Sequence, residues 1–370
     1  MKDFDTIYNE IIAEWLKSNP IKRIVDKLEL SDRKAVVLYG AGRLAKVYKE
    51  AMNSLNITVT AVCDKKAKGK IEELDIITPD ALKTKYSDSM ILVCSYSYNE
   101  QICNELKEWG FLEEQIIPCP NQWPYFESPK SFSKYVEGYK WAYEFFEDEK
   151  SKKLVEAKLR LYLLDKQLIP DTDSDCYYEK DVIKLGTDEV YVDGGAFNGD
   201  STIDFIKKTK GDFKHVFCLE PSSINFKVTT DKLKQYDNVD VINKGLWSSE
   251  EKLQFFFDET NPAGSCLINA SNRAIADENT IYVTSIDSLA EAKNIYPTYI
   301  KMDIEGSEKE ALIGARNTIL KTKPQLAICA YHKVEDVYEL PQTILNIRND
   351  YKFVLRQHMY GCFDTVLYAY

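Results

Sequence analysis

The stretch EVYVDGGAFNGDST, residues 189–202, decides the fold. Its apolar first half is typical of a buried strand, its glycines of a tight turn, and its polar end of a helix start. Glycines at a strand end let the backbone approach a ligand, and a helix start offers unpaired N–H groups with the positive end of the helix dipole. Asp193 stands where a dinucleotide fingerprint has its first glycine, and a carboxylate there would repel a pyrophosphate. The stretch therefore predicts a nucleotide-like cofactor that carries a cationic or amine group.

A second apolar strand, HVFCLEP at residues 215–221, ends in Glu220. An acidic residue at this place can accept hydrogen bonds from both hydroxyls of a ribose. Either feature alone would also suit an α/β domain with a glycine-rich turn and a surface glutamate, but together they favour a nucleoside site. The pair resembles the S-adenosylmethionine site of class I methyltransferases. That resemblance implies that Asp193 lies near the amino-acid end of the cofactor and that Glu220 holds its ribose.

A third strand with an acidic end, YIKMDIEGSE at residues 299–308, precedes a helix expected over 309–320. It resembles the K-x-D-x-E-G-x-E signature of the FkbM-type methyltransferases. Further matching pieces are VINKGLWS (241–248), TSIDSL (284–289) and FDTVLYAY (363–370). The resemblance covers residues 177–370, and its motifs are specific in combination because they occur in the right order. It implies an enzyme that methylates oxygen atoms of sugars or natural products.

In a doubly wound sheet, ligands bind outside the carboxyl ends of the strands, so the three acidic strand ends should converge on one crevice. The candidate contacts of S-adenosylmethionine are Asp193, Gly194, Gly195, Ala196, Asn198, Asp200, Ser201, Glu220, Pro221, Gly245, Leu246 and Asp303.

Methyl transfer needs a positioned acceptor and a group that removes the acceptor proton. The strand expected over 325–330 is followed by Tyr331 and His332, and a histidine can act as this base near neutral pH without a metal. His332, Asp303 and Glu305 are therefore the candidate catalytic residues. The alternative for a lone histidine is a structural role.

Asp303 and Glu305 also fit a second mechanism, in which bound Mg²⁺ or Ca²⁺ holds the acceptor oxygen. His332 or Asp336 could join them, but the sequence shows no complete ligand set, so a metal is not favoured. Lys301 and Glu308 are expected to form ion pairs that fix the turn.

The closing segments 351–358 and 361–368 predict an antiparallel hairpin. Arg356 and His358 alternate to one face of it, where they either contact the acceptor or have a structural role. The insertion 258–265 is expected to form a loop over the pocket, with Ser265 as a candidate acceptor contact.

A second glycine-rich turn, Gly40-Ala41-Gly42, follows the apolar run 34–39, and Asp64 ends the next strand. This G-x-G-x-x-A pattern predicts a Rossmann half that binds NAD, a sugar nucleotide or nothing. Arg43 and Lys46 at the helix start would favour a phosphate. The unit resembles the small Rossmann-like modules attached to enzymes of surface-polysaccharide synthesis, and a degenerate scaffold or an oligomerisation module is favoured over ligand binding.

Composition agrees with a cytoplasmic enzyme. The 370 residues contain 48 Lys and Arg against 59 Asp and Glu, so the net charge is −11 and a nucleic-acid partner is not expected. The nine cysteines include no C-x-x-C pair, which favours a reducing compartment and disfavours structural zinc. Neither a leader nor an apolar run long enough to span a membrane is visible, so no membrane insertion is expected.

The sequence thus predicts an α/β protein with two Rossmann-like doubly wound domains joined by a helical linker. The expected parts are an N-terminal helical segment (1–30), a small Rossmann-like domain (31–120), the linker (121–176) and a class I methyltransferase domain with an antiparallel terminal hairpin (177–370). Two helices, divided near residues 148–151, should brace the second domain.

The predicted function is S-adenosylmethionine-dependent O-methylation of a sugar hydroxyl on a surface polysaccharide or its nucleotide-linked precursor. The acceptor is thus a small molecule or a glycan, and a homo-oligomer is possible. One alternative is a nicotinamide or sugar-nucleotide oxidoreductase that uses the Gly40 turn. Another is a non-catalytic protein that binds a sugar nucleotide or S-adenosylmethionine.

Overall fold

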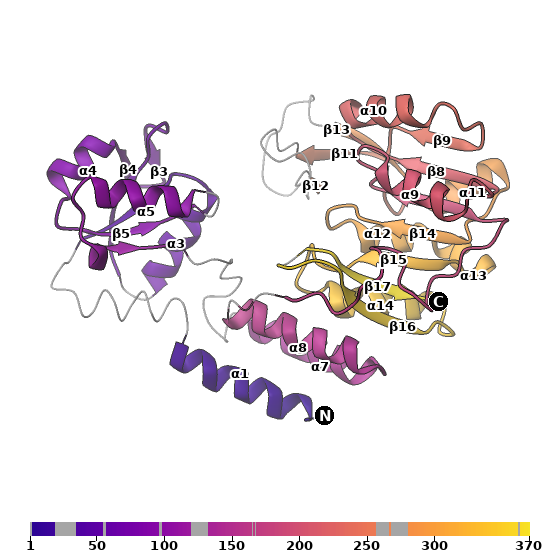
Figure 1. Ribbon diagram of the computed structural model, residues 1–370, viewed down its shortest axis with the longest axis horizontal. Helices are drawn as coiled ribbons and strands as arrows, with labels where there is room; N and C mark the ends of the chain where they lie inside the picture. The colour runs from indigo at the N-terminus through magenta and orange to yellow at the C-terminus, as the bar shows by residue number, and fades with distance from the viewer. Residues whose placement is uncertain are drawn as a thin grey trace. The chain divides into compact units, whose positions relative to one another are not determined.

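The computed structural model describes residues 2–18, 35–54, 57–95, 98–119, 132–164, 166, 168–256, 266–267, 280–361 and 363–370. The chain forms two compact units (Figure 1). The first comprises Met1–Lys134 and Lys158–Gln167, and the second comprises Tyr135–Ala157 and Leu168–Tyr370. The expected linker segment therefore contributes residues to both units. The stretch PNQWP at residues 120–124, whose prolines predict an interruption of regular structure, lies outside the described residues.

The first unit is built on a six-stranded sheet with the order β3-β4-β2-β1-β5-β6. Its strands are β1 (Val36–Tyr39), β2 (Val59–Cys63), β3 (Lys70–Ile71), β4 (Leu74–Ile77), β5 (Met90–Val93) and β6 (Ile116–Ile117). Its helices are α1 (Phe4–Ser18), α3 (Arg43–Ser54), α4 (Pro79–Lys85), α5 (Asn99–Glu108) and the 3₁₀ turn η1 (Glu113–Gln115). β1 pairs in parallel with β2 and β5, and all four of its residues are buried, as its uninterrupted apolar sequence predicts.

The glycine turn of the first unit is held by the side chain of Asp64. Gly40 has φ +111°, and the carboxylate of Asp64 accepts the Ala41 N–H at 2.8 Å. The same carboxylate accepts the N–H groups of Lys66 and Ala67, each at 2.8 Å. Asp64, which would hold a ribose in a dinucleotide site, thus already has three backbone donors.

The second unit is built on a seven-stranded sheet with the order β16-β17-β15-β14-β7-β8-β9. Its strands are β7 (Val190–Gly194), β8 (His215–Leu219), β9 (Val239–Ile242), β14 (Tyr299–Met302), β15 (Gln325–Cys329), β16 (Phe353–Gln357) and β17 (Thr365–Ala369). The pairs from β9 through β15 are parallel, whereas β17 runs antiparallel to both β15 and β16. A smaller sheet with the order β10-β13-β11-β12 contains β10 (Gly245–Leu246), β11 (Glu251–Phe256), β12 (Cys266–Leu267) and β13 (Thr280–Thr284).

The helices of the second unit connect these strands. They are the 3₁₀ turn η2 (Ser133–Tyr135), which begins in the first unit, α7 (Val136–Phe145), α8 (Glu149–Leu164), which continues into the first unit, α9 (Asp200–Lys208), α10 (Ser223–Leu233), α11 (Ile286–Lys293), α12 (Glu308–Ile313), α13 (Arg316–Thr322) and α14 (Asp336–Ile347). α7 and α8 are separate helices, as expected. Tyr139 of α7 donates from its hydroxyl to the Val334 carbonyl at 3.0 Å and packs edge-on against Tyr338 of α14. α7 therefore braces this unit.

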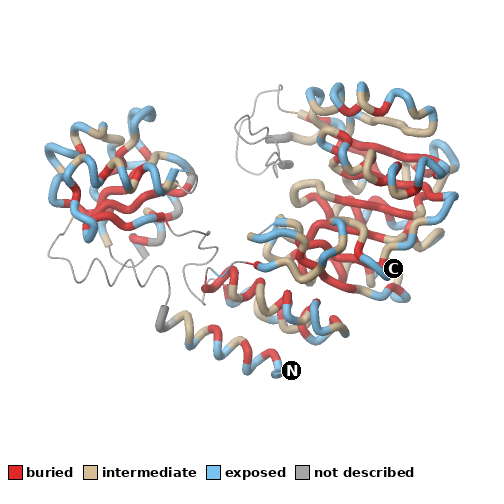
Figure 2. The backbone as a smooth tube through the Cα atoms, in the orientation of Figure 1, coloured by how far each residue is buried: buried red, intermediate tan, exposed pale blue. Residues whose placement is uncertain are grey.

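The core of the second unit lies on its central strands, which Figure 2 shows as buried. Every residue of β7, β8 and β14 is buried. The ring of Tyr191 stacks on Phe205 and Tyr299, with ring centres 4.4 Å and 5.1 Å apart. This packing joins β7, α9 and β14 into one rigid support for the loops at the strand ends.

The strand order reverses between β7 and β14. The chain proceeds from β7 to β8 and β9 on one side, and β14 and β15 lie on the other side. In open α/β sheets, ligands bind in the crevice outside the carboxyl ends of the strands at such a point. We therefore expect a ligand-binding site at the loops that follow β7, β8, β14 and β15. None of the helices in the described parts of the chain is long and apolar enough to cross a membrane.

Candidate functional site

The glycine turn after β7 is shaped by the close approach of other backbone segments. Gly195 has φ +76°, and a Cβ atom there would lie 1.9 Å from the Asp303 carbonyl oxygen. A Cβ atom on Gly194 would lie 2.7 Å from a methyl group of Leu246. Both glycines are thus required by the packing of β14 and β10 against the turn, in addition to any approach of a ligand.

Asp193 lies fully buried at the end of β7. Its carboxylate accepts hydrogen bonds from the hydroxyls of Ser201 and Thr202 at 2.6 Å each and forms a 3.1 Å ion pair with the Lys301 ammonium. Lys301 also donates to the Gly194 and Gly195 carbonyls at 3.1 and 2.9 Å. Asp193 and Lys301 together fix the turn, as expected for Lys301. Contact of Asp193 with a cofactor stays a prediction.

The charge on Lys301 is secured by its neighbours. Burial lowers the pKa of this amine, but the negative charges of Asp193 and Asp303 outweigh that effect and raise the pKa above its ordinary value. A protonated lysine therefore lies beneath the glycine turn, and its side chain is only 3% exposed.

The start of α9 holds the remaining candidates from the turn. Gly199 takes the left-handed conformation at the N-cap, with φ +83°. The side-chain oxygen of Asn198 accepts the Asp200 N–H at 3.1 Å, and the exposed Asp200 carboxylate pairs with Lys232 of α10. These contacts order the helix start and leave Asp200 at the protein surface.

Glu220, directly after β8, is buried and has two backbone partners. Its carboxylate accepts the N–H groups of Phe197 and Ser222, each at 2.8 Å. Burial raises the pKa of Glu220 to about 7, although these hydrogen bonds oppose the effect. A donor such as a ribose hydroxyl would favour the ionised form of this carboxyl.

Gly245 and Leu246 form β10, which pairs in parallel with β13. Both are buried, and a Cβ atom on Gly245 would lie 3.9 Å from the Pro221 ring. The structure therefore brings Gly245 to Pro221 and Leu246 to Gly194.

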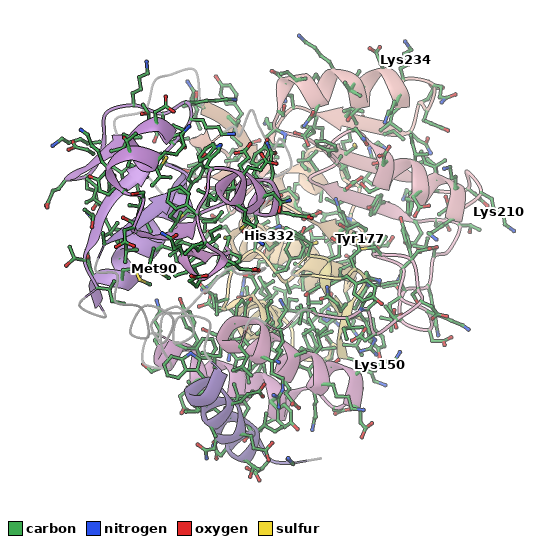
Figure 3. The ribbon with its side chains drawn as sticks, turned by 60° about the vertical axis from the view of Figure 1, so that its left-hand side comes forward. Met90, Lys150, Tyr177, Lys210, Lys234 and His332 are labelled. Atoms are coloured by element: carbon green, nitrogen blue, oxygen red, sulfur yellow. The ribbon has the colours of Figure 1, made fainter. Side chains whose placement is uncertain are left out.

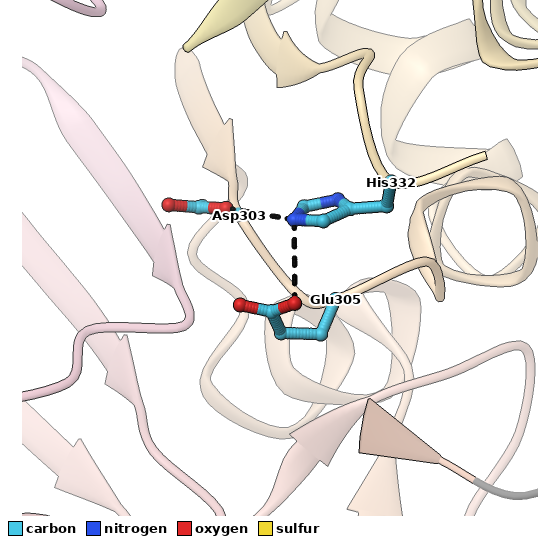
Figure 4. A group of neighbouring side chains, drawn as sticks. All are labelled: Asp303, Glu305 and His332. Atoms are coloured by element: carbon cyan, nitrogen blue, oxygen red, sulfur yellow. Dashed lines mark ion pairs between the residues drawn. The ribbon is translucent and has the colours of Figure 1, made fainter. Parts of the chain in front are cut away.

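The acidic end of β14 meets the histidine that follows β15 (Figure 4). The Nε2 atom of His332 lies 3.4 Å from Asp303 Oδ1 and 3.6 Å from Glu305 Oε2. On the other side of the ring, Nδ1 lies 2.9 Å from Oε1 of Glu308, a residue that is 1% exposed. The three candidate catalytic residues thus form one cluster.

The carboxylates of Asp303, Glu305 and Glu308 and the buried surroundings shift the pKa values within this cluster. Burial lowers the pKa of His332, but Glu308 and Asp303 outweigh it and hold the pKa well above its ordinary value. Burial raises the pKa of Glu305 to about 7, with smaller contributions from the charges around it. Burial alone would raise the pKa of Asp303, but the neighbouring His332 and the charge of Lys301 outweigh it and lower that pKa. In this state His332 carries a proton and is not ready to accept another.

Two tyrosines complete the surroundings of Asp303, and sequence reasoning did not assign either of them. The hydroxyl of Tyr177 donates to Asp303 Oδ2 at 3.0 Å, and that of Tyr331 donates to Oδ1 at 3.1 Å. Tyr331 was recognisable beside His332. Tyr177, labelled with His332 in Figure 3, comes from an irregular segment with φ +69° and carries no motif that could have identified it.

Two further candidate residues, Arg356 and His358, lie at the end of β16 and directly after it. Arg356 is buried and pairs with Asp148 at 2.9 Å and Glu179 at 3.1 Å. His358 contacts the Tyr368 hydroxyl at 2.8 Å through Nε2. Both residues thus have structural partners. Ser265 and the insertion 258–265 lie outside the described residues.

Comparisons with known proteins agree with this architecture. Residues 32–117 match the family model described as C2185-like, N-terminal, and residues 193–355 match the Methyltransferase FkbM domain. No curated protein matches the sequence.

Among solved structures, the chain is similar to a methyltransferase FkbM from Methylobacillus flagellatus KT, with a TM-score of 0.61, 23% identity and 100% of both chains covered. Weaker similarity extends to an rRNA methylase from Streptococcus thermophilus (TM-score 0.32, 14% identity, 50% of this chain and 87% of that chain). Fibrillarin from Aeropyrum pernix, solved with S-adenosyl-L-methionine, shows a TM-score of 0.30 at 11% identity, over 52% of this chain and 71% of that chain. The region that contains the glycine turn, Glu220 and the Asp303 cluster, residues 193–355, belongs to the FkbM methyltransferase family.

Proposed function

We propose that this methyltransferase uses S-adenosylmethionine to methylate a sugar hydroxyl on a surface polysaccharide or on its nucleotide-linked precursor. The observation that carries the proposal is the arrangement at the point where the strand order reverses. There the β7 turn and the end of β14 are in contact, because Gly195 lies against the Asp303 carbonyl. A cofactor at this crevice would have its reacting group beside the Asp303 cluster.

Glu220 is the proposed ribose ligand. Its carboxylate is already oriented by the Phe197 and Ser222 N–H groups, and it follows β8, the strand next to β7. Such a preoriented acceptor suits the two hydroxyls of a ribose. The methyl group would then face the acceptor at the end of β14.

The Asp303 cluster is the proposed acceptor side. The acceptor oxygen forms a bond to the methyl carbon, the carbon–sulfur bond breaks with its electron pair left on sulfur, and the hydroxyl proton passes to water. Phe363 is 60% exposed and lies edge-on to Tyr331, which donates to Asp303. This exposed ring offers an apolar face for the C–H side of a sugar, which supports a glycan acceptor.

Calorimetry on the full chain tests the cofactor. We expect S-adenosylhomocysteine to bind one-to-one and NAD not to bind. Glu220→Gln should weaken S-adenosylhomocysteine binding about tenfold, because a neutral amide is a poorer acceptor for two hydroxyls. Glu291→Gln, on the exposed side of α11, is the matched control and should change nothing. NAD binding without S-adenosylhomocysteine binding would reverse the proposal.

Mass spectrometry of the host's glycans tests the acceptor. We expect one sugar to lose one methyl group per residue when this protein is removed and to regain it when the protein is restored. Restoration by a His332→Ala variant would contradict the placement of the acceptor at the cluster.

A further inference from the structure

The side chain of His332 points into a group of oxygen atoms but is not hydrogen-bonded to them. The side chain is 7% exposed, and neither ring nitrogen has an aligned hydrogen-bond partner among the described residues. Nevertheless Nε2 faces Asp303 and Glu305 (Figure 4). Buried polar atoms are as a rule hydrogen-bonded, and an ion or a water molecule held at Nε2 would satisfy this one.

The spacing of the carboxylate oxygens of Asp303 and Glu305 and of His332 Nε2 suits a divalent cation. One ligand atom each from Asp303, Glu305 and His332 can be chosen so that all three lie within 4.8 Å of one another. Ligands about 2.1–2.4 Å from an octahedral ion are about 3.0–3.4 Å apart when adjacent. The Nε2 atom lies 3.4 and 3.6 Å from its two carboxylate neighbours, which is close to the separation of adjacent ligands.

The surroundings of the three residues match those of metal ligands. Glu308 Oε1 lies 2.9 Å from His332 Nδ1, where a carboxylate can hold the proton on Nδ1, so that a cation has to displace only the proton on Nε2. Both oxygens of Asp303 are oriented by tyrosine hydroxyls. Metal-binding histidines and carboxylates are commonly held in this way by a second layer of partners.

The backbone at Glu305 supports the same interpretation. Glu305 has φ +55° and is followed by Gly306 at φ +90°. The left-handed conformation is unfavourable for a residue with a side chain, so the surrounding structure must impose it. Here it places a second carboxylate beside His332, two residues after Asp303.

We propose that Asp303, Glu305 and His332 bind a divalent cation of the Mg²⁺ and Mn²⁺ class, which holds the acceptor hydroxyl. Two carboxylates favour these cations, and the imidazole favours Mn²⁺ over Mg²⁺. Three protein ligands leave positions open for water and for the acceptor oxygen, whose proton the cation makes easier to lose to water. The role of the cation rests on the proposed function, but its binding does not.

Titration of the full, chelator-treated chain with Mn²⁺, followed by electron paramagnetic resonance of the free ion, tests the site. We expect one Mn²⁺ per chain, and at least a tenfold loss of affinity in Glu305→Gln and in His332→Gln. The Glu291→Gln control should bind as the unaltered chain does. Calorimetry with S-adenosylhomocysteine, in the absence of metal, should show the same affinity for Glu305→Gln as for the unaltered chain, which establishes that this variant is folded.

Two results would overturn the cation site: no saturable Mn²⁺ binding by the unaltered chain, or equal affinity in the Glu305→Gln variant. Either result with normal S-adenosylhomocysteine binding would leave the proposed methyl transfer standing. Failure to bind S-adenosylhomocysteine alongside normal Mn²⁺ binding would instead contradict the proposed function and leave the site intact.

Discussion

Lys301 carries a positive charge into the interior of the second unit, where Asp193 compensates it. Lys301→Met would leave the fully buried Asp193 carboxylate with two hydroxyl donors but without a countercharge. Removal of one partner from a buried pair costs about 3–5 kcal/mol. We expect a loss of that size in the free energy of unfolding measured with urea.

Lys309→Met is the matched control, because Lys309 is 45% exposed and pairs with Glu339 at the surface. Its loss should be below about 1 kcal/mol. Equal losses in the two variants would contradict a stabilising role for the buried pair.

The raised pKa of Glu220 leads to a prediction of how cofactor binding depends on pH. Its pKa is raised to about 7 by burial, so the carboxyl takes up a proton as the pH falls through neutrality. Ribose hydroxyls donate to the ionised form, and apparent affinity scales with the fraction in the binding form. The affinity for S-adenosylhomocysteine should therefore fall about tenfold from about pH 8 to about pH 6. Calorimetry at several pH values measures this change, and Glu220→Gln should show a smaller one.

Among the elements, the turn between β7 and α9 gives the sharpest steric test. Gly195→Ala adds a Cβ atom 1.9 Å from the Asp303 carbonyl oxygen at φ +76°. The strained backbone and the overlap should together cost at least about 3 kcal/mol and displace the end of β14. We expect thermal unfolding to show the loss and calorimetry to show weakened S-adenosylhomocysteine binding.

Gly211→Ala separates the cost of the strained backbone from the cost of the steric overlap. Gly211 has φ +78°, but nothing lies within 4 Å of the Cβ atom that the substitution would add. This variant should lose only about 1–2 kcal/mol, from the backbone conformation alone, and should bind S-adenosylhomocysteine normally. Similar behaviour of the two alanine variants would contradict the steric argument.

The sequence predicted those elements whose signal is local. The largely apolar stretches 189–194, 215–219 and 299–302 contain β7, β8 and β14, because parallel strands covered on both faces have few polar residues. The strand ends then identified Asp303, Glu305 and His332, which the fold brings together.

Contacts between distant segments could not be predicted in this way. Tyr177 reaches Asp303 across 126 positions of the sequence. Asp171 lies in the acid-rich stretch IPDTDSD at residues 169–175, and such stretches are usually solvated. It nevertheless accepts the Gln357 N–H, and burial raises its pKa to about 6. Such partners depend on tertiary packing, which leaves no periodic signal.

At the scale of the whole molecule, each unit has its own buried apolar cluster. We expect urea to unfold the chain in two transitions. S-adenosylhomocysteine at a concentration one hundred times its dissociation constant should stabilise one of them by about 2.7 kcal/mol. Circular dichroism with and without the ligand measures this, and an equal shift of both transitions would contradict independent units.

The division of the chain was not predictable from composition. Helix α8 begins in the second unit at Glu149 and ends in the first at Leu164. A continuous helix shows no boundary in its sequence, because the same 3.6-residue pattern serves whichever core it contacts.

The position of β17 between β15 and β16 bears on how the protein is made. Synthesis from the N-terminus produces β15 and His332 while the edge that β17 will cover is still open. Asp148 and Glu179 are likewise synthesised before Arg356, which forms an ion pair with each of them. An unpaired strand edge and buried charges without partners are features that chaperones and proteases act on. A nascent chain interrupted before β16 should therefore be degraded, so that a methyltransferase site appears in the cell only on chains whose closing hairpin has been translated.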